Sequence, residues 1–142
     1  MLGIVKTNVN EKEGKCTMNR FESQYKSFWA NAKVDKKKGS GVGILIENKW
    51  EKYIRNIERI NEFILIVKLY FKQMQLIIRV VYLPPNDKDL YKLIQRKLVE
   101  IVNANRQTAQ IIFMGDFNFV VDSTLDKKNK RIHMKKDLLL FK

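Results

Sequence analysis

"IIFMGDFNF" occupies residues 111–119 and joins a buried-strand pattern to a polar end. Its first four residues are strongly apolar, which is typical of a strand covered on both faces. Gly115 ends the apolar run, and a carboxylate at Asp116 and a carboxamide at Asn118 follow it. We therefore expect a strand over residues 110–115 that holds these two polar groups rigidly at one end.

A second strand pattern ends in a comparable way. Residues 74–83 read MQLIIRVVYL, and two prolines stop the pattern just after Tyr82. The preceding run, residues 63–71, reads FILIVKLYF, and only Lys72 and Gln73 lie between the two runs. This spacing predicts an antiparallel hairpin.

The two strand ends carry groups that suit phosphate chemistry if they meet at one edge of a sheet. A carboxylate such as Asp116 can bind a divalent cation or orient a water molecule. A carboxamide such as Asn118 can donate hydrogen bonds to a developing oxyanion, and a phenol such as Tyr82 can donate to a phosphate oxygen. The alternative is structural, because Gly-Asp after a strand is often a plain turn in which the aspartate caps its own backbone.

The remaining pattern adds strands and one helix. Further strands are expected at residues 2–5, within 25–33, at 42–47 and at 53–60. A helix is expected over residues 87–103, with Asn86 or Asp87 as its cap. Its apolar face comprises Leu90, Leu93, Ile94, Leu98, Ile101 and Val102. The polar residues 8–20 are expected to form a loop, and "KKKGSG" lacks the spacing of a phosphate-binding loop.

Composition bounds the class of protein. The chain has 142 residues, enough for one modest domain, and a formal net charge of +13. That charge attracts polyanions, nucleic acid first among them, although a basic surface can also serve solubility alone. One cysteine and one histidine give no disulfide framework and no zinc spacing. With no apolar run of about 18 residues and no leader pattern, we expect a soluble intracellular protein without a membrane partner.

The sequence "MGDFN" at residues 114–118, with "VYLPPND" at 81–87 upstream and "KKKGSGVGILI" at 36–46, resembles the endonuclease/exonuclease/phosphatase superfamily. The similarity is closest to the endonuclease domains of non-LTR retrotransposons and extends over residues 2–130. It implies an α/β (α+β) fold, a partial four-layer α/β/β/α sandwich, with residues 1–142 forming a single incomplete domain. It also implies Mg²⁺-dependent hydrolysis of phosphodiesters and a nucleic-acid partner, DNA rather than RNA, with no obligate protein partner inferred.

The resemblance assigns roles to three residues. Asp116 would orient or deprotonate the attacking water and is the candidate metal ligand. Asn118 would hold the scissile phosphate and the charge of the transition state. Tyr82 would donate a hydrogen bond to the phosphate.

Three departures from the family pattern weaken the catalytic interpretation. Lys6, in "LGIVKT", stands where relatives carry the glutamate that is the principal Mg²⁺ ligand, and an ammonium there repels the ion. The family's first strand and its final Ser-Asp-His-like motif have no counterpart, and we interpret Asp122, Asp126 and His133 as loop residues.

The sequence therefore predicts an endonuclease-like fragment that is weakly active or inactive as it stands. One alternative is a basic nucleic-acid-binding module without catalysis. Another is an active enzyme formed by a longer product, which flanking coding sequence would reveal. If the alignment at residues 2–7 is shifted, Lys6 is instead an ordinary exposed lysine.

Overall fold

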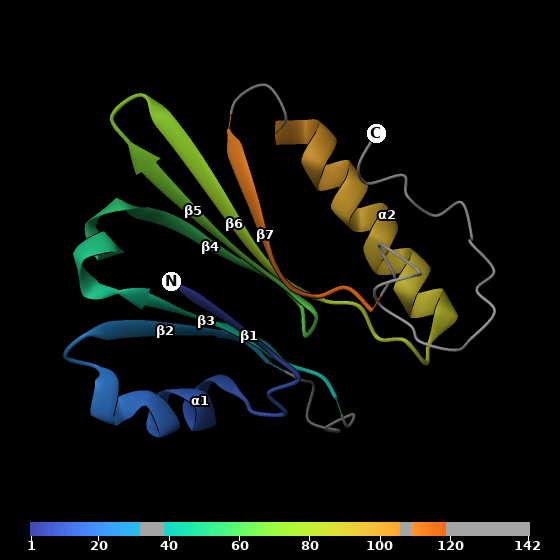
Figure 1. Ribbon diagram of the computed structural model, residues 1–142, viewed down its shortest axis with the longest axis horizontal. Helices are drawn as coiled ribbons and strands as arrows, with labels where there is room; N and C mark the ends of the chain where they lie inside the picture. Colours follow the sequence, from blue (N-terminus) through green and yellow to red (C-terminus); the bar gives the residue numbers. More distant parts are fainter. Residues whose placement is uncertain (32–38, 106–108, 119–142) are drawn as a thin grey trace, which may run out of the picture.

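The computed structural model describes residues 1–31, 39–105 and 109–118, which form two facing β-sheets with one helix on the outside of each (Figure 1). The smaller sheet has the strand order β1-β3-β2 and the larger sheet the order β4-β5-β6-β7. The strands are β1 (Leu2–Val5), β2 (Tyr25–Ala30), β3 (Val42–Glu47), β4 (Ile54–Asn61), β5 (Ile64–Phe71), β6 (Met74–Tyr82) and β7 (Gln110–Asp116). The helices are α1 (Glu11–Met18) and α2 (Lys88–Asn105), with short 3₁₀ turns at Asn19–Phe21 and Asn48–Tyr53.

This arrangement confirms the predicted α+β class and the α/β/β/α layering. The core lies between the two sheets, where most residues of the central strands β3 and β5 are buried. On the other face of the larger sheet, Ile94 and Leu98 of α2 are fully buried against the core. Each layer therefore hides an apolar surface that it could not hide alone.

The predicted hairpin is present. β5 and β6 pair antiparallel from Ile64 opposite Val81 to Phe71 opposite Met74, so Lys72 and Gln73 form a two-residue turn. Lys72 has a φ of 40°, in the left-handed region that tight hairpin turns require. β6 then pairs in parallel with β7, and α2 makes the crossover between them.

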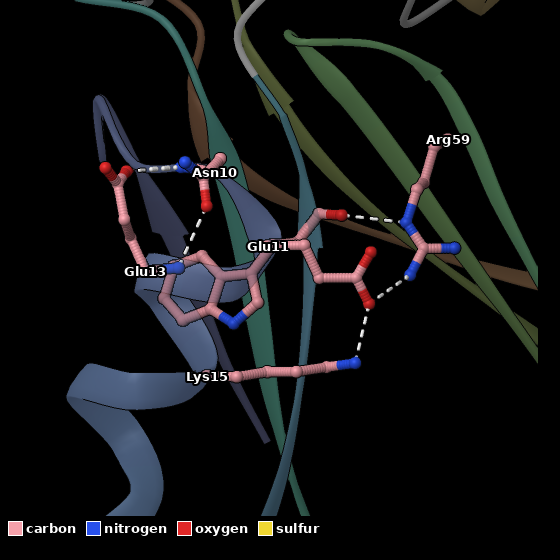
Figure 2. Close-up of polar contacts among 6 residues, drawn as sticks. Asn10, Glu11, Glu13, Lys15 and Arg59 are labelled. Atoms are coloured by element: carbon pink, nitrogen blue, oxygen red, sulfur yellow. Dashed lines mark hydrogen bonds and ion pairs between the residues drawn. The ribbon is translucent and has the colours of Figure 1, made fainter.

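The expectation of a loop over residues 8–20 was wrong, because α1 forms there. Asn10 caps the helix: its side chain accepts from the backbone N–H of Glu13, and the Glu13 carboxylate accepts from the backbone N–H of Asn10 (Figure 2). This reciprocal pair satisfies two otherwise free donors and starts a helix that has no strong apolar stripe.

A contact distant in sequence holds α1 in place. The Glu11 carboxylate pairs with Lys15, one helical turn on, at 2.8 Å and with Arg59 of β4 at 3.3 Å (Figure 2). The same Arg59 side chain donates through Nε to the carbonyl oxygen of Trp29 at 2.8 Å. One guanidinium thus links α1 and β2 to β4 of the opposite sheet.

Two residues expected inside the core are exposed. Leu93, placed by its spacing on the buried face of α2, is 60% exposed, and Ile112 of β7 is 46% exposed. Leu93 lies at the margin of the apolar stripe, beside the buried Ile94. In the described part of the chain β7 is an edge strand beside β6, and the exposure of Ile112 shows that one of its faces is not fully covered, contrary to the prediction from its apolar run.

Two glycines make room for the largest side chain of the smaller sheet. Trp29 is 3% exposed and lies between Gly14 of α1 and Gly43 of β3. A Cβ atom at either glycine would overlap the indole ring. The close approach of α1 to the sheet depends on both.

We expect Gly43→Ala to lower the free energy of unfolding by about 1–3 kcal/mol, because the added methyl group forces the indole out of its site. Urea unfolding measures the change. In a Trp29→Leu background the ring is absent, and the same glycine substitution should then lower the free energy of unfolding much less. An equal decrease in the free energy of unfolding in the two backgrounds would contradict this packing.

Candidate functional site

The ends of β6 and β7 bring two of the predicted site residues together. Tyr82 lies opposite Asp116 in the parallel pairing, and the backbone N–H of Leu83 donates to the carbonyl oxygen of Asp116 at 2.9 Å. Gly115, with a φ of 140°, precedes the carboxylate, and a Cβ atom there would overlap the Val81 carbonyl. Only glycine allows β7 to run this close to β6 and still aim Asp116 at the strand ends.

Lys6 reaches the same place from the other sheet. β1 lies against β6 and β7, and Lys6 is the first residue after β1. Its Nζ atom is 2.8 Å from Oδ2 of Asp116 and 4.9 Å from the centroid of the Tyr82 ring. The backbone of Lys6 has a φ of 57°, a left-handed conformation that is uncommon for lysine. The lysine side chain therefore points at the carboxylate and the phenol.

Asn118 lies at this site but is turned partly away from the carboxylate. Its backbone N–H donates to Oδ1 of Asp116 at 3.1 Å, and its side-chain amide donates to the carbonyl oxygen of Leu83 at 2.7 Å. One of the two amide N–H groups of Asn118 is therefore used in the hydrogen bond that connects the end of β7 to the residue after β6. The residue is exposed, and its second amide N–H takes no part in that bond.

Asn8 is a residue of this region that the sequence reasoning missed. Its side-chain oxygen accepts from the backbone N–H groups of Gly39 at 2.7 Å and Ser40 at 3.2 Å. Gly39 in turn faces the Tyr82 hydroxyl, which lies 3.7 Å from the position of a Cβ atom there. The available signal was an asparagine in a polar turn, a residue type that tolerates the left-handed φ of 52° found here.

A cavity of about 190 Å³ opens beside Tyr82. Gly39 and Ser40 form one side, the turn from Pro84 to Asp87 forms the other, and Phe63 and Leu90 add apolar surface. The Ser40 hydroxyl is buried and has no hydrogen-bond partner among the described residues. Tyr82 lines this cavity and also lies beside Lys6, whereas neither Lys6 nor Asp116 lines the cavity itself.

The pairing of Lys6 with Asp116 shifts the pKa of both groups. The hydrogen bond to Asp116 raises the pKa of Lys6 above its ordinary value, and burial opposes this only in part. Partial burial works to raise the pKa of Asp116, but hydrogen bonds from Lys6 and Asn118 outweigh it and hold that pKa below its ordinary value. Both groups are charged at neutral pH.

These residues do not fit a magnesium site. Mg²⁺ binds through carboxylates, and here the one carboxylate at the strand ends is paired with an ammonium. In the described part of the chain, no group of three or more histidine, cysteine, aspartate or glutamate side chains is placed to hold a metal ion. Asp122, Asp126 and His133 lie outside the described residues.

The structure is similar to three crystal structures of TDP2 from Caenorhabditis elegans, a protein of the endonuclease/exonuclease/phosphatase fold. The fold of this chain is of that type. A selenomethionine form has a TM-score of 0.55 with 14% identity, covering 84% of this chain and 37% of that one. A truncated form has a TM-score of 0.56 with 14% identity, covering 84% of this chain and 50% of that one. A third structure has a TM-score of 0.55 with 14% identity, covering 84% of this chain and 38% of that one.

The chain spans half or less of the length of these structures. No protein-family model matches the chain, and no curated protein matches it in sequence. Within its described residues, neither helix combines the length and the apolar character needed to cross a bilayer. The likeness therefore establishes the fold, and the roles of Asp116, Asn118 and Tyr82 stay predictions.

We expect Mg²⁺ to leave the melting temperature of the wild-type chain unchanged and to raise that of Lys6→Glu by a few degrees. The substitution sets a second carboxylate beside Asp116, and a ligand stabilises the folded state that it binds. Differential scanning fluorimetry in MgCl₂ and in NaCl of equal ionic strength measures the effect. Lys97→Glu, on the exposed side of α2, is the control and should not respond. A rise in the melting temperature of the wild type with Mg²⁺ as large as that of Lys6→Glu would contradict the absence of a metal site.

We expect the ion pair to stabilise the fold only within a pH window. The folded-state pKa of Asp116 lies below its ordinary value of 3.8, so its contribution is present above that pH and lost as the pH falls through the folded-state pKa. The folded-state pKa of Lys6 lies above 10.5, so its contribution is present below that pH and lost as the pH rises through the higher value.

Thermal melts of the wild type and Asp116→Asn across pH test this window. Their melting temperatures should differ by no more than a few degrees near neutral pH, because exposed ion pairs contribute little. The difference should shrink at acid pH, as the wild-type carboxylate takes up its proton. A difference that grows toward acid pH would count against the ion pair.

Proposed function

We propose that this chain is an endonuclease-type domain, related to those of non-LTR retrotransposons, that hydrolyses phosphodiesters weakly or not at all as it stands. The observation that carries this proposal is the 2.8 Å contact between Lys6 and Asp116 at the edge where Tyr82 also ends. An endonuclease of this type needs a free carboxylate that orients water and binds Mg²⁺. Here that carboxylate is occupied by an ammonium.

The nucleic-acid partner is part of the same proposal. The net charge of +13 attracts a phosphate backbone, and DNA is the expected substrate from the resemblance to retrotransposon endonucleases. We propose that the Tyr82 hydroxyl and the second amide N–H of Asn118 donate to a phosphate oxygen. Lys6 adds a positive charge at the same edge.

We expect supercoiled plasmid incubated with the purified chain and Mg²⁺ to be nicked no faster than with the Asp116→Ala variant. Agarose gels that separate nicked from supercoiled DNA follow the reaction. The physical reason is that a paired Asp116 neither accepts a proton from water nor holds the metal. Robust nicking by the wild type that Asp116→Ala abolishes would overturn the proposed loss of activity.

A basic nucleic-acid-binding module without catalysis is the second candidate, and the net charge of +13 favours it. Filter binding of DNA across a range of salt concentrations distinguishes the two candidates from a protein with no nucleic-acid function. Binding whose affinity falls steeply with salt, without cleavage, supports a binding module. No affinity at low salt would remove both candidates.

A further inference from the structure

The ammonium of Lys6 lies directly beside the carboxylate of Asp116. Nζ lies 2.8 Å from Oδ2 of Asp116 and near the Tyr82 ring. The side chains of Lys6 and Asp116 are 45% and 33% exposed, so solvent reaches the pair. A molecule arriving from solvent can therefore contact the ammonium without the protein unfolding.

An ammonium keeps donors available after it has paired with one carboxylate. Lysine has three N–H groups, and the contact with Asp116 directs one of them at Oδ2. The nearby backbone N–H groups of Gly39 and Ser40 are already taken by Asn8, and one amide N–H of Asn118 is taken by Leu83. In the part of the chain that the structure describes, Lys6 is thus a charged donor at this edge that a phosphate would meet.

We infer that Lys6 replaces the divalent cation, so that the site holds a DNA phosphate without metal, and that Asp116 competes with the phosphate for the ammonium. This inference rests on the proposed nucleic-acid-binding function and specifies how that site takes its ligand. A charge-assisted hydrogen bond from the exposed ammonium holds the phosphate. Asp116, which a metal-dependent site requires, weakens binding here because it occupies one N–H group of the ammonium and offsets its positive charge.

Removing the charge of Asp116 should change DNA affinity in opposite directions in a metal-dependent site and in a site where lysine is the cation. In a metal-dependent site, removing the carboxylate charge loses the metal and weakens binding. In a site where lysine is the cation, the same change frees the ammonium and strengthens binding. Asp116→Asn keeps the size of the side chain and removes only the charge, so it tests the sign with little change in packing.

Fluorescence anisotropy with a short fluorescein-labelled DNA duplex and the full chain tests the inference. Titrations are run in EDTA and in MgCl₂, at equal ionic strength. We expect the wild type to bind in EDTA and Lys6→Gln to bind about 3- to 10-fold more weakly, with a salt slope smaller by about one. Lys6→Arg keeps the charge and should retain most of the affinity. Asp116→Asn should bind about 3- to 10-fold more tightly.

Matched controls separate the site from the overall charge. Lys97→Gln and Glu100→Gln remove the same charges from exposed positions of α2, and each should change affinity less than its counterpart at the site. In the Lys6→Gln background, Asp116→Asn should lose most of its effect, because the two residues act on one another. Circular dichroism melts establish that each variant is folded.

The outcomes distinguish the inference from the function on which it rests. If the wild type does not bind the duplex even at low salt, the proposed nucleic-acid function fails. If it binds but needs Mg²⁺, or if Asp116→Asn weakens binding, the inference fails and the proposed function stands. The inference also fails if Lys6→Gln and Lys97→Gln lower DNA affinity by the same factor while both variants remain folded.

Discussion

The parallel pairing of β6 with β7 is the constraint on which the site depends. It places Tyr82 opposite Asp116 at one edge of the larger sheet, and it requires α2 to make the crossover. It also requires a glycine at position 115, because no side chain fits against the Val81 carbonyl at that point. The backbone bond from Leu83 to Asp116 and the amide bond from Asn118 to Leu83 then fix the two strand ends to each other.

The smaller sheet contributes a positive charge, that of Lys6, to the edge of the larger sheet where Asp116 lies. β1 carries Lys6 to the ends of β6 and β7, and the ammonium pairs with the carboxylate. In the proposed function, the strand ends correspond to an endonuclease-type site in which Lys6 changes the electrostatics. The ammonium of Lys6 lies at the carboxylate of Asp116, where the proposal would otherwise expect a metal ion. We propose that this difference favours anion binding over activation of water.

Much of the fold follows from local sequence patterns, and the exceptions have physical causes. Strong apolar runs and a two-residue turn predicted β5 and β6, and helical spacing predicted α2. The α1 helix was missed because its stability comes from the Asn10 cap and from Arg59, which lies 48 residues beyond Glu11. Spacing alone could not show that Leu93 and Ile112 are exposed, because cover depends on the neighbouring elements.

Other features required the tertiary structure or a family resemblance. Arg79, a polar residue in an apolar strand, is fully buried, donates to the Ile101 carbonyl at 3.1 Å and lies 5.3 Å from the Phe113 ring. Burial lowers its pKa to about 10. The convergence of Tyr82 and Asp116 was expected only if their strands shared a direction. The place of Lys6 was suggested by resemblance, and its direct contact with Asp116 is a result of the structure.

The central claim is that Lys6, and no metal ion, neutralises Asp116. The most direct measurement is a crystal structure of the chain grown with Mn²⁺ in place of Mg²⁺, with anomalous scattering recorded to locate the ion. We predict no anomalous peak beside Asp116 and a lysine nitrogen within hydrogen-bond distance of its carboxylate. A manganese peak coordinated by Asp116, with the Lys6 side chain swung into solvent, would contradict the account.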